Sequence, residues 1–266
     1  MAHLIGSIPF KGSIGGLSAY TRSDIDKIII RTKGGASKEQ IKKKPSFAAT
    51  RKINQEWKGV TMMSKNIREN IVAVKHLADY NFTGTLNARC KKMQYADIQN
   101  ENGKRSVLLS ATRYLLDEFS LNKRMSFDAV LKQPLGCLIQ RNENKVLIDI
   151  APIYPSINFV NPCKYPFYRF VFMLGYVSDL LYNSAQERYI TQAIDMPHAM
   201  DKRTEWVSVQ KKVQQQQVLL ESNGALILND AITIIVSAGI EFGLPAIDGT
   251  IAYAKYSGCG KLLKLG

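Results

Sequence analysis

The glycines near the start of the chain have a spacing that could bind phosphate. They lie in the sequence Gly12-Ser13-Ile14-Gly15-Gly16. Backbone amides of a glycine turn bind phosphate when the turn follows a strand and leads into a helix. Here no strong strand precedes the turn, no Lys-Ser/Thr pair closes it, and the residues after it predict a strand. A second group, Gly258-Cys259-Gly260-Lys261, leaves only five residues after its lysine. We therefore predict no nucleotide site at either group.

The residues that could bind a metal or catalyse a reaction are scattered along the chain. The three histidines, His3, His76 and His198, lack the short spacings of metal ligands. No Gly-x-Ser-x-Gly segment marks a serine nucleophile. The acidic residues, including the neighbours Asp117 and Glu118, show no pairing typical of acid–base catalysis. We therefore predict no metal, no cofactor and no catalytic residue, and we expect a protein that is not an enzyme.

The basic residues carry a stronger signal, because they gather in one half of the chain. Residues 1–132 contain 24 Lys and Arg against 11 Asp and Glu, whereas residues 133–266 contain 12 against 11. The first half therefore carries almost the whole net charge of +14. A positive field concentrated on one region attracts polyanions or acidic partner surfaces. We expect a partner to bind to this half.

Composition and cysteine spacing indicate a protein that folds without disulfides. The chain has 266 residues, of which 45% are hydrophobic, enough for a substantial core. Its four cysteines stand far apart, which predicts buried free thiols: Cys90, Cys137, Cys163 and Cys259. No secretory signal and no apolar run of about 18 residues are present. We therefore predict a soluble protein without membrane insertion, in the cytoplasm or in an intracellularly assembled particle.

The first half predicts a hairpin followed by helices. Strands are expected over 17–20 and 27–32, which is rich in β-branched residues. From Ser46 to about Ala78 the apolar residues follow a helical period: Ile53, Trp57, Val60, Ile67, Ile71 and Val74. Arg51, Lys58 and Lys65 recur every seven residues on the opposite face. Two more helices are expected, one containing Leu86, Cys90 and Met93, the other starting at Ser106 and containing Leu108, Leu115 and Phe119.

The second half predicts short antiparallel strands. Residues 137–140 and 145–150 flank a turn at 141–144, and further strands are expected over 168–174, 205–209, 217–221, 231–239 and 251–256. This spacing favours a β-sandwich, with a barrel as the alternative. We therefore predict an α+β fold: an N-terminal β-hairpin arm over 1–45, a helical region over 46–133, and a C-terminal antiparallel β-sandwich-like domain over 134–266.

The chain also resembles a family of uncharacterised bacterial proteins. The resemblance rests on the glycine hairpin 12–20, the strand end 30–35 and the helix start from Phe47 to Arg51. It extends to two later stretches, 76–84 and 239–243. The family has a glycine hairpin, a strand that ends in arginine and a basic helix, with no assigned activity. Comparable openings occur in proteins that look phage-associated, so the resemblance implies a structural role, by analogy alone.

Two functional hypotheses follow. The first is a non-enzymatic structural protein that self-assembles into a homo-oligomer, filament or particle, with the basic N-terminal arm on a neighbouring subunit. The alternative is a basic, sequence-independent nucleic-acid-binding protein. A third possibility, a carbohydrate- or ligand-binding β-sandwich, rests on Trp206 and the tyrosines of the second half. The residues expected to contact a neighbouring subunit or a polyanion are Gly12, Gly15, Gly16, Tyr20, Arg31, Lys33, Lys42, Lys43, Lys44, Arg51, Lys58 and Lys65.

Overall fold

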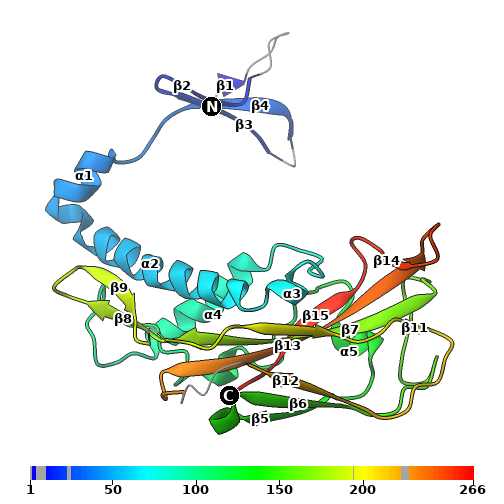
Figure 1. The fold of residues 1–266 in the computed structure, drawn as a ribbon. Coiled ribbons are helices and arrows are strands. Elements are labelled where there is room, and N and C mark those ends of the chain that lie inside the picture. Colours follow the sequence, from blue (N-terminus) through cyan, green and yellow to red (C-terminus); the bar gives the residue numbers. More distant parts are fainter. Residues whose placement is uncertain (1, 4–9, 23–24, 194, 223–227) are drawn as a thin grey trace. The chain divides into compact units, whose positions relative to one another are not determined.

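The structure is a computed structural model that describes residues 2–3, 10–22, 25–193, 195–222 and 228–266. The chain forms two compact units, Met1–Arg51 and Lys52–Gly266 (Figure 1). The helices predicted after the N-terminal arm and the strands of the second half lie together in the larger unit. The predicted α+β class is confirmed, with a hairpin near the N-terminus and a strand-rich C-terminal part.

The first unit contains a four-stranded antiparallel sheet and a short helix. Its strands are β1 (Ala2–His3), β2 (Gly12–Ile14), β3 (Leu17–Arg22) and β4 (Ile25–Thr32), in the order β1-β4-β3-β2. The predicted hairpin is confirmed as the pair β3 and β4. Helix α1 (Lys38–Lys43), which the sequence reading missed, begins at a capping box: Ser37 Oγ accepts the Gln40 N–H, and the Gln40 side chain accepts the Ser37 N–H. A 3₁₀ turn, η1 (Pro45–Phe47), follows.

The helices of the larger unit are shorter than expected. They are α2 (Ala48–Glu69), which begins within the first unit, α3 (Val72–Lys75), α4 (Thr83–Tyr95) and α5 (Phe127–Val130). The helix predicted to reach Ala78 ends at Glu69, and the chain resumes helical geometry only in α3. The inner part of its apolar stripe is buried, but Ile53 is 56% and Trp57 45% exposed. The stripe is buried only from Val60 onward, and the neighbouring Gly59 packs directly against the ring of Tyr189.

The helix predicted from Ser106 is wrong. The segment contains only a single 3₁₀ turn, η2 (Arg113–Leu115), and Val107 pairs with Leu180 as a β-bridge. Two carboxylates hold its backbone in place: Asp97 accepts the N–H of Ser106 at 2.7 Å, and Asp179 accepts the N–H of Ser110 at 2.9 Å. These bonds offer the backbone an alternative to helical pairing.

The strands of the larger unit form two main sheets. The large sheet is built on β7 (Phe167–Ser178) and β13 (Ile232–Pro245), with β10 (Met200–Arg203), β11 (Val207–Ser208), β14 (Ile251–Tyr253) and β15 (Cys259–Leu265). The small sheet has the order β12-β6-β5, from β12 (Gln216–Glu221), β6 (Lys145–Ile150) and β5 (Gly136–Gln140). A 3₁₀ turn, η3 (Arg141–Glu143), joins β5 to β6, and β8 (Leu180–Asn183) pairs with β9 (Arg188–Thr191). The predicted strands are confirmed, although those at 205–209 and 251–256 are shorter and that at 231–239 extends to Pro245.

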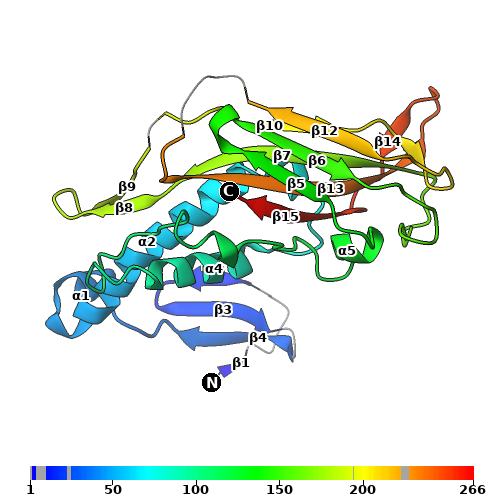
Figure 2. The ribbon, with the colours of Figure 1, turned by 90° about the horizontal axis from the view of Figure 1, so that it is seen from below.

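The larger unit has three layers. The small sheet covers one face of the large sheet and the helices cover the other (Figures 1 and 2). Alternate residues of β7 therefore serve different cores: Phe170 and Phe172 pack between the sheets, whereas Val171 and Met173 pack against the helices. This explains why β7 and β13 are apolar without alternation. None of the described helices is long and apolar enough to span a membrane.

Candidate functional site

The predicted glycine residues form the exposed tip of a β-hairpin. Gly15 and Gly16 make the turn between β2 and β3, and Gly12 lies in β2. Gly12 has a φ of +121° and Gly15 of +53°, conformations that favour glycine. A Cβ added at any of the three would meet no heavy atom within 4 Å. The tip is therefore slim and open on its sides, and it leads into a strand and not into a phosphate-binding helix terminus.

One face of this small sheet is apolar, and its part next to the turn is exposed, whereas Ala19 further along is buried. Directly paired residues of antiparallel strands point to the same face. Ile14 pairs with Leu17, and Ala19, two residues along β3, pairs with Ile30. Ile14 is 61% and Leu17 42% exposed. We call Ile14, Leu17, Ala19 and Ile30 the hairpin face. Tyr20 lies on the other face, where the guanidinium of Arg31 stands 5.3 Å from its ring centre.

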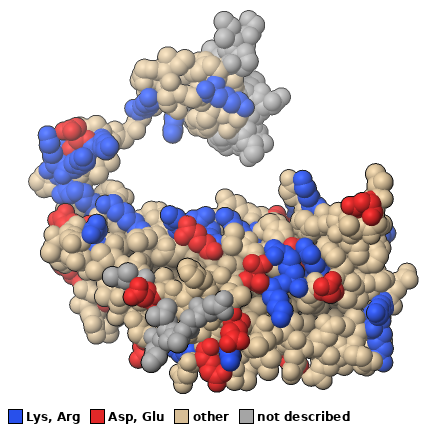
Figure 3. Space-filling model, in the orientation of Figure 1, with Lys and Arg blue, Asp and Glu red and all other residues tan. Residues whose placement is uncertain are grey.

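The predicted lysines of the first unit are exposed. The unit contains 10 Lys and Arg against 3 Asp and Glu, and Figure 3 shows basic side chains gathered over α1. Lys42 and Lys44 are exposed, as is Lys33 after β4. Lys43 forms a surface ion pair with Glu39 at 3.0 Å. Such pairs contribute little to stability, so the lysines remain available to an acidic partner.

The three predicted residues of the basic stripe have different roles. Arg51 belongs to the first unit, and its Nη1 donates to the carbonyls of Ile41 at 2.7 Å and Lys44 at 2.9 Å. These carbonyls lie at the C-terminal end of α1, so Arg51 caps that helix. Lys58 and Lys65 lie on α2 in the larger unit, and both are exposed. The three residues therefore do not form one continuous basic face: Arg51 caps α1, and Lys58 and Lys65 are exposed on α2.

The sequence reading missed a buried carboxylate surrounded by cations. Glu241 of β13, whose side chain is 3% exposed, lies 2.8 Å from His76 Nε2 and accepts a hydrogen bond of 2.7 Å from Arg169 Nε. Arg169 in turn stacks on the ring of Trp206 at 4.3 Å. Burial tends to raise the pKa of Glu241, but the hydrogen bonds and charges of His76 and Arg169 lower it overall. His76, directly after α3, thereby ties the end of that helix to the large sheet.

Two further ion-pair clusters join distant segments of the larger unit. Lys261 of β15 is 6% exposed and pairs with Asp128 of α5 at 2.7 Å, and also with Glu118. Glu56 of α2 is 2% exposed and pairs with Lys91 of α4 at 2.6 Å. The carboxylate of Glu56 also accepts the backbone N–H of Gly103 at 2.9 Å. Because each buried charge already has its partners, these clusters hold segments together and offer no free group for chemistry.

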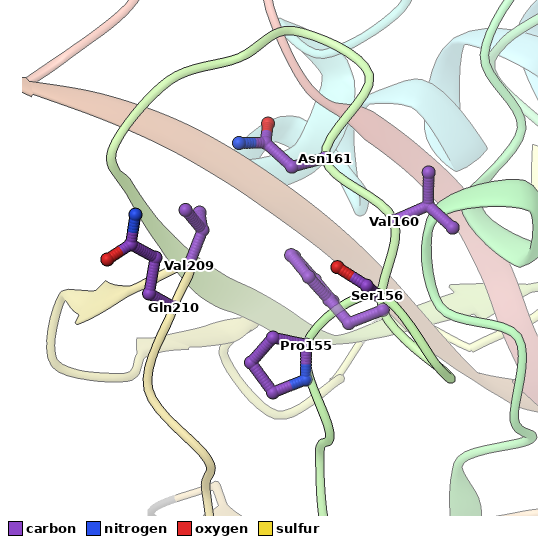
Figure 4. A pocket seen from close by; sticks show the side chains of 7 residues that line it. Pro155, Ser156, Val160, Asn161, Val209 and Gln210 are labelled. Carbon is purple, nitrogen blue, oxygen red and sulfur yellow. The ribbon is translucent and has the colours of Figure 1, made fainter.

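A cavity of about 520 Å³ lies between the segments 155–161 and 209–210. Figure 4 shows Asn161 and Gln210 on the two opposite segments that line it. Its lining is neutral: Pro155, Ser156, Phe159, Val160, Asn161, Val209 and Gln210. The cavity therefore offers amide and hydroxyl groups but no side chain that titrates near neutral pH. Trp206, on which the ligand-binding hypothesis rested, does not line it and packs over Gly243 and Arg169.

The described residues contain no group of three or more His, Cys, Asp or Glu that could hold a metal ion. The described cysteines are free thiols, and burial raises the pKa of Cys90 to about 12 and that of Cys137 to about 11. Comparison of the chain with protein-family models, curated proteins and solved structures finds no match. The resemblance to a bacterial family therefore stays a prediction.

Proposed function

We propose that this protein is a non-enzymatic structural protein that assembles into a homo-oligomer or filament, with its first unit in contact with a neighbouring subunit. The main support is the small amount of burial in that unit. Among the residues of this unit whose burial the structure describes (10–21 and 28–51), only Ala19 and Ile29 are buried, while Ile14 and Leu17 are exposed on the hairpin face. A small sheet needs a hydrophobic face packed against something to be stable. A neighbouring subunit supplies that surface.

Burial of the hairpin face can contribute binding free energy to such a contact. Burying one Ile or Leu side chain contributes roughly 1.5–3 kcal/mol, so Ile14 and Leu17 together contribute about 3–6 kcal/mol before the entropic costs of association are subtracted. The first unit and the larger unit differ in size and chemistry. A contact between unlike surfaces generates a ring if the rotation closes and a filament if it does not.

The alternative proposal is sequence-independent binding of nucleic acid through the exposed lysines of the first unit. Its specific support is the run of Lys42 and Lys43, at the end of α1, and Lys44, which follows the helix directly; α1 has no buried residue. Phosphate contacts of this kind weaken steeply with salt. If this alternative holds, replacing the three lysines with glutamate lowers the affinity for DNA or RNA. It also makes the affinity fall less steeply with salt concentration. Undetectable or salt-independent binding by the unaltered protein excludes it.

The test of self-assembly is the molar mass in solution of nuclease-treated protein, measured by light scattering after size exclusion over a range of concentrations. We expect a mass well above the 29.8 kDa of one chain, and a shift toward one chain in the double variant Ile14→Lys, Leu17→Lys. The matched control is Ile98→Lys, Ile247→Lys, which adds the same charge at two highly exposed positions, 91% and 109%, of the larger unit. A monomer at all concentrations refutes the proposal, and equal masses for the two double variants refute the role of the hairpin face.

A further inference from the structure

The two sheets of the larger unit each end in an edge strand on the same side. Strand β10 pairs with β7, and β12 pairs with β6; neither has a second strand partner among the described residues. Figure 2 shows the two strands next to each other. A cleft of about 490 Å³ separates them, and the described residues that line it belong to these two strands: Met200, Asp201, Lys202, Leu219, Leu220 and Glu221. At one end it is closed by a hydrogen bond of 2.9 Å from Ser222 Oγ to the carbonyl of His198.

The backbone of β12 presents a hydrogen-bonding edge to this cleft. The carbonyl of Leu219 accepts a bond of 3.5 Å from Lys202 Nζ of β10, so it points away from β6 and toward the cleft. Because the N–H and C=O of one strand residue point the same way and the direction alternates, Gln217 and Glu221 share this orientation. A contact of 3.5 Å is at the outer limit of a hydrogen bond. An incoming strand can therefore displace it.

The side chains of the cleft match a short, partly apolar strand. Met200 is 36% and Leu219 43% exposed, which gives the cleft an apolar rim. Of the two carboxylates in the lining, Asp201 forms an ion pair with Arg203 and Glu221 forms one with Lys145 at 3.4 Å, so the cleft has no excess negative charge. An unpaired edge of this kind is a template for strand addition, in which main-chain bonds give affinity and side chains give specificity.

Strand β2 of the first unit has the complementary properties. It is the outer strand of its sheet, and all three of its residues are exposed. Gly12 has no side chain to keep a second backbone away, and Ile14 is 61% exposed. We propose that β2 of a second copy adds to the β12 edge at this cleft; this inference rests on the proposed self-assembly and names its acceptor surface.

The experiment is disulfide trapping between two different copies. Cys137 and Cys163, the partly exposed native thiols, are first replaced by serine. One variant then carries Ile14→Cys and the other Leu219→Cys, and the two are mixed and oxidised mildly. The matched control replaces the second variant with Leu138→Cys, because Leu138 is an exposed leucine, 56%, on β5 at the opposite edge of the small sheet. We expect at least fivefold more mixed dimer with Leu219→Cys than with the control. Equal yields, or no mixed dimer, overturn the inference.

A second measurement separates this inference from the proposed function. Light scattering is repeated with Leu219→Lys and with Leu138→Lys, each of which adds one charge to an edge strand of the small sheet. We expect Leu219→Lys to lower the mass of the assembly at a given concentration, and Leu138→Lys to leave it unchanged. If the unaltered protein assembles but the two variants behave alike, self-assembly stands and the cleft is not its acceptor. If the unaltered protein is a monomer, both proposals fail.

Discussion

Gly258 is the position where a single methyl group is expected to destabilise the larger unit most clearly. It precedes β15 in the glycine group that could have suggested a phosphate site, and the structure gives it a packing role. Its φ is +109°, and an added Cβ would lie 2.3 Å from the carbonyl oxygen of Ile240. That oxygen belongs to the backbone of the central strand β13, so it cannot move aside cheaply. Gly258→Ala therefore combines backbone strain with a steric overlap.

The two contributions can be separated with Gly249→Ala. Gly249 also has a positive φ, +81°, but a Cβ there meets no heavy atom within 4 Å. A left-handed backbone costs an alanine about 1–2 kcal/mol, and this cost applies to both variants. The lower entropy of the unfolded chain also favours both variants equally. Overpacking costs typically about 1–3 kcal/mol. We therefore expect Gly258→Ala to lower the free energy of unfolding by about 2–5 kcal/mol, and Gly249→Ala by about 1–2 kcal/mol.

The assay is urea denaturation followed by tryptophan fluorescence. The chain has two tryptophans, Trp57 and Trp206, and both belong to the larger unit, so their signal follows the unfolding of that unit. The midpoint is expected to fall further for Gly258→Ala than for Gly249→Ala, with similar slopes. If the two variants lose the same stability, the close approach of Gly258 to Ile240 is not a real constraint, and the reasoning fails.

Three other results are expected. The folded state lowers the pKa of the Glu241 carboxyl below its ordinary value of 4.5, so this carboxylate stabilises the fold fully above pH 4.5 and loses that effect as the pH falls through the folded pKa. Glu241→Gln should therefore be less stable than the unaltered protein at pH 7. Between about pH 4.5 and pH 3 the variant should lose less stability than the unaltered protein does. Burial of Cys90 predicts that its thiol does not react with a thiol reagent at pH 8 until denaturant is added, and labelling of the native protein at Cys90 would contradict this. Arg51→Met removes the cap of α1 and should increase amide hydrogen exchange at its C-terminal turn, whereas Lys52→Met should leave exchange there unchanged.

Local patterns were sufficient to predict the strands and the hairpin. The β-branched run 27–32 and the alternation in 145–150 arise because side chains of a strand pack on one apolar face. The pattern therefore appears in residues that are close together in the sequence. The helix predicted from Ser106 failed for the opposite reason. Its backbone is held by Asp97 and Asp179, the second of which lies 69 residues away from its partner Ser110. A tertiary contact of that kind does not change the spacing of apolar residues within the segment, so the sequence pattern cannot predict it.

The candidate site shows the same division. The exposed glycine tip and the lysines of α1 follow from composition, because they depend on few neighbours. The environment of Glu241 could not be predicted, since His76 and Arg169 lie 165 and 72 residues away from it in the sequence. The spacing of Arg51 predicted one member of a basic stripe, but Arg51 caps the C-terminal end of α1, a helix that the sequence did not predict. The contacts of these charged residues thus depend on which helices and strands end next to them in the fold, and less on their spacing in the sequence.

The proposed contact also has a consequence for the form of the assembly. Strand β2 and the β12 edge are different surfaces on the same chain, so one copy can donate a strand and accept another at the same time. Such a contact cannot close on itself as a symmetric pair, and it extends from copy to copy until geometry closes a ring. An excess of copies altered at Leu219 would still donate β2 but could not accept it, and would therefore end each growing chain. Mixing Leu219→Lys protein into unaltered protein should then shorten the assemblies in proportion to the fraction added, whereas a two-fold symmetric dimer would only be diluted into mixed pairs.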